Sequence, residues 1–127
     1  NNRIQMINDE IKVIDTINNV KLNKPKFLTT ADNSTYWLYS NNKIIKIYND
    51  TSSELPTNSI TDLKVDGNND IYYLDLVDES LKTIKNGTVN SEVIKSGLNL
   101  NNDSKLLLLN NNTIAVSTNK EITLYSL

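Results

Sequence analysis

Short segments in which apolar and polar side chains alternate run along most of the chain, and clusters of asparagine separate them. Alternation is typical of β-strands, because successive side chains of a strand point to opposite faces of the sheet. These segments are rich in isoleucine, valine, tyrosine and threonine, which favour strands. We expect strands at residues 3–7, 10–14, 36–39, 44–48, 61–65, 71–75, 81–84 and 121–125. No segment has a capped helical stripe, so the predicted fold class is all-β.

Asparagine accounts for 22 residues, whereas the chain has three glycines and two prolines. The asparagine side chain bonds to nearby backbone groups and tolerates the left-handed geometry that tight turns require. We therefore expect asparagine to be the main turn residue, in clusters such as Asn41-Asn42, Asn68-Asn69 and Asn101-Asn102.

One strand pattern recurs along the chain, at residues 3–7, 35–39, 70–74 and 113–117. The intervals between its anchor positions are 32, 35 and 43 residues, counted from Ile4, Tyr36, Ile71 and Ile114. An interval near 40 that holds three or four short antiparallel strands is typical of a β-propeller blade. We predict a propeller-like array of short blades that forms a partial ring. It would be one domain, a fragment of a longer chain, with units at roughly 1–25, 26–59, 60–102 and 103–127.

Two other all-β folds stay open. A β-trefoil would divide the 127 residues into three units of about 42, but the strand pattern starts four times. A β-sandwich is the plainer alternative, since it also joins short strands by turns. A propeller differs from both because each small sheet must stack on its neighbours to bury its faces.

The stretch from Leu55 to Leu74 carries the most specific motif of the chain. It opens with Leu-Pro-Thr-Asn-Ser-Ile, continues through a strand to Asp66 and a Gly/Asn turn, and ends on an aliphatic residue followed by aromatic ones. This order resembles the propeller repeat of two-component regulators. Where that family usually has Trp-Ile-Gly-Thr, this chain has Tyr72 and Tyr73 followed by Leu74 and an aspartate.

The motif agrees physically with a blade. Pro56 restricts φ before the strand, Ile60 and Leu63 are expected to pack inward, and residues 66–69 to form the hairpin turn. The resemblance implies an extracytoplasmic sensor propeller, a non-catalytic module that binds a ligand or partner and passes a small packing change to an output domain. It places the chain in a bacterial signalling or cell-surface protein, outside the cytoplasm.

The amino-acid composition excludes several classes of functional site. The chain has neither cysteine nor histidine, which excludes disulfides, thiolate metal sites and imidazole catalysis. A net charge of −2, a single arginine and scattered lysines argue against nucleic acid as a partner. No apolar run approaches the roughly 20 residues that span a bilayer, so we expect no membrane insertion. We expect the protein not to be an enzyme, with no catalytic residue, cofactor or metal.

Residues 66–70 place oxygen-bearing side chains at positions one, three and five, as calcium loops do. However, Ile71 stands where such a loop needs glycine, and Val77 stands where it needs a bidentate glutamate. The favoured interpretation is that these side chains cap backbone N–H groups of a hairpin turn.

Asp75, Asp78 and Glu79 form the densest acidic cluster and could supply a carboxylate pair for acid/base work on a sugar. No basic side chain is adjacent to them in the sequence, and no apolar setting that would raise a pKa is visible. We therefore expect these carboxylates to be solvated.

Aromatic side chains with a polar tip suit two places, the packing layer between blades and a recognition surface for sugars or peptides. For Trp37 and Tyr72, and less strongly for Tyr39, packing between blades is the favoured interpretation. The candidate ligand-binding residues are Trp37, Tyr39, Tyr72, Tyr73 and Asp75.

A partial ring would leave blade faces uncovered, which favours the remaining blades of the parent protein, or a second copy, as partners. We expect a non-catalytic module that binds a carbohydrate, a peptide or a protein partner. The alternatives are a structural scaffold without a small-molecule ligand and a carbohydrate-active propeller enzyme.

Overall fold

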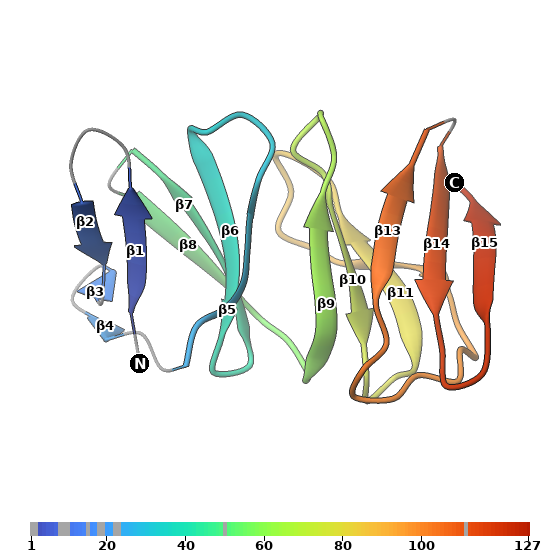
Figure 1. The fold of residues 1–127 in the computed structure, drawn as a ribbon. Coiled ribbons are helices and arrows are strands. Elements are labelled where there is room, and N and C mark those ends of the chain that lie inside the picture. The colour runs from blue at the N-terminus through green and yellow to red at the C-terminus, as the bar shows by residue number, and fades with distance from the viewer. Residues whose placement is uncertain are drawn as a thin grey trace.

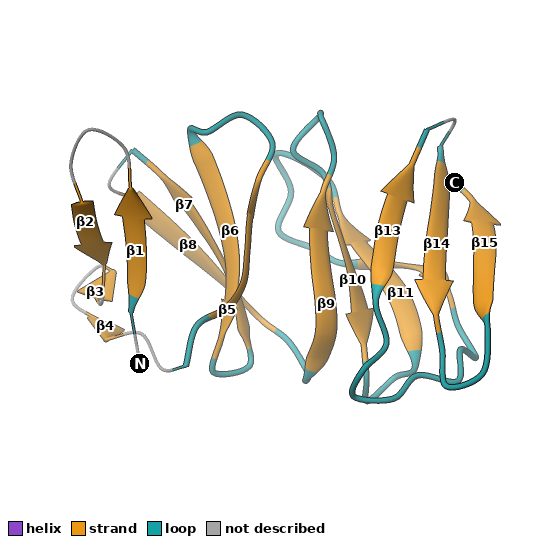
Figure 2. Cartoon of the chain, viewed as in Figure 1, coloured by secondary structure: helices purple, strands orange, loops and turns teal. Residues whose placement is uncertain are grey.

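The structure is a computed structural model, and it describes residues 3–7, 11–14, 16–17, 20–21, 24–49, 51–110 and 112–127. These residues form strands joined by turns and loops, with no helix among them (Figure 2). The all-β fold class is therefore confirmed. Residue 10 of the strand expected at 10–14, and part of the unit expected at 1–25, lie outside the described residues. Nothing described here is a helix long and apolar enough to cross a bilayer.

The strands form antiparallel sheets in which each strand pairs with its neighbours in the sequence. Sheet I contains β5 (Lys26–Thr30), β6 (Thr35–Ser40), β7 (Lys43–Tyr48) and β8 (Thr51–Pro56). Sheet II contains β9 (Ile60–Val65), β10 (Ile71–Asp75), β11 (Ser80–Ile84) and β12 (Glu92–Lys95). Sheet III contains β13 (Leu106–Leu109), β14 (Thr113–Ser117) and β15 (Ile122–Ser126). Two shorter pairs precede them, β1 (Ile4–Ile7) with β2 (Ile11–Ile14) and β3 (Thr16–Ile17) with β4 (Val20–Lys21).

Sheets I, II and III stand side by side (Figure 1). Strand β9 contacts β5 and β6 of sheet I on one side and β13 of sheet III on the other. Sheet II is thus the middle of three stacked sheets. This arrangement is neither a three-fold barrel nor a two-layer sandwich, so the two alternative folds do not apply.

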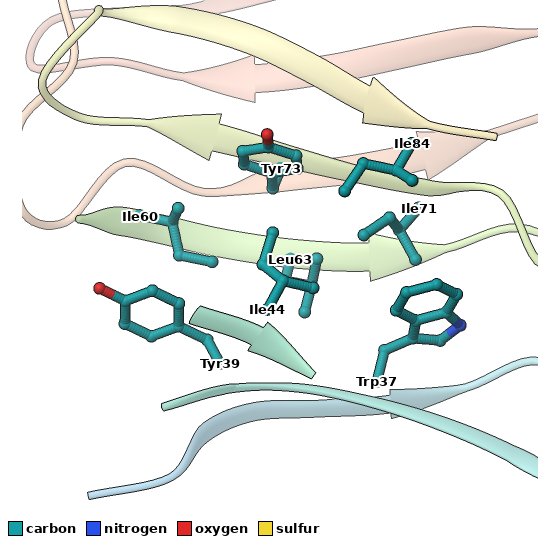
Figure 3. Close-up of a cluster of buried hydrophobic side chains, with 8 residues drawn as sticks. All are labelled: Trp37, Tyr39, Ile44, Ile60, Leu63, Ile71, Tyr73 and Ile84. Atoms are coloured by element: carbon teal, nitrogen blue, oxygen red, sulfur yellow. The ribbon is translucent and has the colours of Figure 1, made fainter. Parts of the chain in front are cut away.

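Two hydrophobic clusters fill the spaces between the sheets. Between sheets I and II lie Trp37, Tyr39, Ile44, Ile60, Leu63, Ile71, Tyr73 and Ile84 (Figure 3). Between sheets II and III lie Tyr72, Leu74, Leu81, Leu98, Leu100, Leu106, Ile114 and Val116. Strand β10 contributes to both, because alternate side chains point to opposite faces and every one of its five residues is buried.

A buried carboxylate links sheet II to sheet III. The side chain of Asp62 on β9 accepts hydrogen bonds from the backbone N–H of Leu106 on β13 at 2.9 Å and from that of Leu63 at 2.9 Å. The ammonium group of Lys64 lies 3.1 Å from the same carboxylate. Because the carboxylate has donors on both sheets, Asp62 fixes the position of β13 beside β9.

Asparagine supplies most of the left-handed turn positions, as expected. Among the described residues other than glycine, nine have a positive φ, and six of these nine are asparagine. In the β6–β7 turn, Asn41 and Asn42 have φ values of 50° and 59° between the paired residues Ser40 and Lys43. A two-residue hairpin loop with two left-handed residues matches the right-handed twist of its strands.

The segment from Leu55 to Leu74 crosses from β8 of sheet I to β10 of sheet II. Ile60 and Leu63 are buried, with 7% and 2% of their surface exposed, as the motif predicted. The turn between β9 and β10 closes where the backbone N–H of Asp66 donates to the carbonyl of Asp70 at 3.0 Å. The inward packing and the turn expected from this motif are therefore confirmed.

The sequence pattern missed six of the observed strands: the two-residue strands β3 and β4, and the longer β5, β8, β12 and β13. Strands β8 and β12 lie at the outer edges of sheets I and II, and most of their residues are exposed. An edge strand is kept polar and short, so it has little of the alternation that identifies a strand. Strand β13 is a run of four leucines, which also lacks alternation.

Replacing Leu63 with alanine should lower the free energy of unfolding by about 2–5 kcal/mol, because it opens a cavity between sheets I and II. Urea denaturation of the Leu63→Ala variant measures the loss. Val77→Ala is the control, since this valine of the β10–β11 turn is 66% exposed and its truncation should cost about 0.5 kcal/mol. Equal losses in the two variants would contradict the stacked arrangement.

Candidate functional site

All five candidate ligand-binding residues are buried, with exposed fractions between 1% and 8%. The structure brings Trp37, Tyr39 and Tyr73 together in the cluster between sheets I and II (Figure 3). It separates them from Tyr72, which faces sheet III. Asp75 lies at the end of β10. In this arrangement the aromatic rings form the packing layers between sheets.

The polar tips of two of these tyrosines have partners within the turns. The hydroxyl of Tyr39 donates to the side-chain carbonyl of Asn42 at 2.7 Å, and that of Tyr72 donates to the Asp66 carboxylate at 3.3 Å. Burial, and then the negative charge of Asp66, raise the pKa of Tyr72 above its ordinary value. Both hydroxyls thus help to hold a turn in place.

The carboxylate of Asp75 is fully engaged. It accepts hydrogen bonds from the backbone N–H groups of Val77 and Asp78, both at 3.0 Å, and from the side-chain amide of Asn58 at 3.1 Å. The ammonium group of Lys82 lies 2.8 Å from the same carboxylate and 2.6 Å from that of Asp78. Asp75 therefore organises the β10–β11 turn.

The expectation that these carboxylates are solvated is wrong for Asp75, which is 1% exposed and paired with Lys82. The hairpin pairs Asp75 with Ser80 and Tyr73 with Lys82, which brings the lysine back beside the carboxylate although it lies seven residues away. Burial raises the pKa of Asp75, but hydrogen bonds from the Asp78 amide, Lys82 and Asn58 outweigh it and hold the pKa below its ordinary value near 3.8. Such a carboxylate stays ionised and is poorly suited to act as a general acid.

In the turn at residues 66–70, side-chain carboxylate oxygens accept hydrogen bonds from backbone N–H groups. One carboxylate oxygen of Asp66 accepts from the N–H groups of Asn68 at 2.8 Å and Asp70 at 3.0 Å. The carboxylate of Asp70 accepts from the N–H of Asn86 at 2.7 Å. This geometry is the turn capping that the sequence favoured over a calcium loop. Within the described part of the chain, no group of three or more acidic side chains is placed to hold a metal ion.

A polar cleft of about 510 Å³ opens where the turns of sheets II and III meet; we call it the loop cleft. It is lined by Glu79, Asn99, Leu100, Asn101, Thr118, Asn119, Lys120 and Glu121. These residues belong to the β10–β11 turn, the β12–β13 connection and the β14–β15 turn, which reach the same end of the two sheets (Figure 1). A hydrogen bond of 3.2 Å between Asn101 and Asn119 joins two of these segments.

A second, smaller cleft of about 240 Å³ lies between the outer part of sheet I and the connection that follows β11; we call it the Trp37 cleft. Its lining includes Trp37, Ile44, Lys46, Leu55 and Ile84. The indole N–H of Trp37 is buried and has no hydrogen-bond partner among the described residues. A buried donor without an acceptor costs about 1–3 kcal/mol, so an acceptor that reached this group would stabilise the site.

Sequence reasoning found neither cleft. The loop cleft is made of asparagines and charged residues from three turns, and only contact between two sheets brings these turns together. Trp37 was recognised as a candidate, but Lys46 was not. The signal that could have located it is the β6–β7 hairpin register, which pairs Trp37 directly with Lys46.

No protein-family model and no curated protein matches the chain. Among solved structures, the crystal structure of selenomethionine-substituted virginiamycin B lyase from Staphylococcus aureus is similar, with a TM-score of 0.66 and 16% sequence identity. The similarity covers 99% of this chain and 49% of that chain. The chain has a β-propeller-like fold. Sheets I, II and III correspond to blades, and the chain spans about half the length of the lyase. A likeness at this identity shows the fold alone.

The Asp75→Asn variant should be destabilised by about 3 kcal/mol, because Lys82, whose side chain is 13% exposed, loses its closest buried partner. The matched control Asp78→Asn removes a carboxylate that is 51% exposed and should cost less than about 1 kcal/mol. Since the pKa of Asp75 is lower in the folded than in the unfolded chain, its contribution is present above pH 3.8 and is lost as the pH falls further. Urea titrations at about pH 7 and about pH 3 should therefore show a smaller acid-induced loss in Asp75→Asn than in the wild type. An unchanged acid-induced loss would contradict this role.

Proposed function

We propose that the chain is a non-catalytic binding module that takes a polar ligand in the loop cleft. The observation that carries the proposal is the convergence of three turns from two blades around this one cleft. Its volume of about 510 Å³ lies within the range of ordinary ligand sites, and loops held by a rigid scaffold are where binding residues concentrate. The engagement of Asp75 by four donors supports a role without catalysis.

The lining of the loop cleft favours a ligand rich in hydroxyl or amide groups. Three asparagine side chains offer both donors and acceptors, and Glu79, Lys120 and Glu121 add charges of both signs. The buried side chain of Leu100 provides an apolar floor. A carbohydrate or an extended peptide has the chemistry to use these groups.

More specifically, we propose that the chain is the sensor part of a bacterial signalling or cell-surface protein, located outside the cytoplasm. The support for it is the motif from Leu55 to Leu74, which resembles the propeller repeat of two-component regulators. Ligand binding between two blades would change their packing, and that change would be passed to an attached output domain.

An interaction scaffold is a second candidate function, and the outer face of sheet III favours it. Leu107, Ala115 and Leu124 form one cross-strand row on this face, with Leu109 and Ile122 on the same side. The four larger side chains are 40% to 74% exposed. On sheets I and II the equivalent face is covered by the next sheet, so this face is suited to a further blade or a second copy.

Binding in the loop cleft is tested with an array of oligosaccharides and short peptides, using the melting temperature as the readout. A saturating ligand should stabilise the protein by about 2–4 kcal/mol. Asn99→Ala should weaken binding of that ligand by about fivefold, because it removes hydrogen-bonding groups from the lining. Asn90→Ala, an exposed asparagine outside the cleft, is the control. Equal binding by both variants would contradict the loop cleft as the site.

The scaffold function predicts self-association through sheet III. The wild type should sediment as a dimer at micromolar concentration, and Leu124→Lys should be monomeric because a lysine cannot be buried unpaired in the contact. Val77→Lys, which changes a 66% exposed valine in the β10–β11 turn, should remain dimeric. A monomeric wild type would remove self-association as the function of this face.

A further inference from the structure

The Trp37 cleft is independent of the loop cleft and offers different chemistry. The indole of Trp37 is 5% exposed, and its N–H group has no acceptor among the described residues. Figure 3 shows the indole nitrogen at the outer edge of the cluster, on the side of the ring away from Leu63 and Ile44. The residues that follow β11, Gly87, Thr88 and Val89, line the cleft.

Lys46 brings a positive charge to the same cleft. The hairpin register pairs Lys46 with Trp37 on one side and with Ser53 on the other, so the three side chains stand in one row on the face toward sheet II. The ammonium group lies 5.3 Å from the centre of the Trp37 ring. The indole N–H and the ammonium group are both donors only, so together they select an acceptor, and the charge selects an anionic one.

Glu54 also lines the cleft but does not oppose an anion there. Strand alternation places its side chain on the other face of sheet I, with Lys43 and Ile45. On that face its carboxylate forms a salt bridge of 3.0 Å with Lys43. Lys46 is thus the charged side chain on the cleft side of β7 and β8.

The rest of the lining is apolar. Ile44 and Ile84 are buried, Leu55 is half-buried, and Val89 is 67% exposed at the mouth of the cleft. The volume of about 240 Å³ accommodates about eight heavy atoms, since one water takes about 30 Å³ in the liquid. This is too small for an extended polymer but sufficient for a carboxylate with a short branched chain.

We propose that the Trp37 cleft binds a carboxylate that carries a short aliphatic chain. The carboxylate accepts a hydrogen bond from the indole N–H of Trp37 and pairs with the ammonium group of Lys46. The aliphatic chain packs against Ile44, Leu55 and Ile84. The same chemistry occurs in a free short-chain acid and at the C-terminus of a peptide that ends in leucine, and the test separates these two sources.

Trp37 is the only tryptophan of the chain, so its fluorescence reports directly on the cleft. The probes are 4-methylpentanoate and the peptide acetyl-Gly-Leu, each beside its uncharged amide. A saturable fluorescence change is expected with the acids, and binding at least about tenfold weaker with the amides, because the charge-assisted pair with Lys46 is lost. Tighter binding of the peptide acid identifies a C-terminus as the source, and tighter binding of 4-methylpentanoate identifies a free acid.

Two variants complete the test. Lys46→Gln should weaken the binding of the acids by about tenfold, and Trp37→Phe, followed by calorimetry, should weaken it by about fivefold because the ring stays apolar but loses its N–H. Lys95→Gln is the matched control, since Lys95 lies 5.8 Å above the ring of Tyr125, outside the cleft. The proposal is overturned if neither acid produces a saturable change, if the amides bind as tightly as the acids, or if Lys46→Gln and Lys95→Gln bind equally.

Discussion

A small sheet with apolar side chains on both faces is unstable until both faces are covered, and this constraint organises the whole molecule. Sheet II meets it fully, because sheet I covers Ile71 and Tyr73 while sheet III covers Tyr72 and Leu74. Sheet III meets it on one face only. The sheets therefore stack side by side, because each one needs a neighbour to cover an apolar face.

Stacking of small twisted sheets also explains where the polar features lie. Buried carboxylates are tolerated where they find several donors, as Asp62 does between sheets II and III and Asp75 does at the β10–β11 turn. The two clefts each lie between neighbouring blades, and they differ in chemistry. The loop cleft is polar and formed by turns, whereas the Trp37 cleft is apolar with two donors.

Much of the fold could be predicted from local patterns. Alternation located the inner strands such as β6, β9 and β10, and asparagine marked the turns because it tolerates a positive φ. The edge strands β8 and β12 were not predicted because most of their side chains face solvent, and exposed positions need not alternate between apolar and polar residues.

The sequence by itself determined the all-β class, the recurring strand unit and the absence of histidine and cysteine chemistry, because these depend on residue types and on spacing along one strand. Only the tertiary structure decided which aromatic rings are buried, that Lys82 neutralises Asp75, and that Lys46 stands over Trp37. These relations depend on hairpin register and on contact between sheets. Hairpin register joins residues on different strands, and sheet contact joins residues further apart in the chain, so alternation along a single strand records neither.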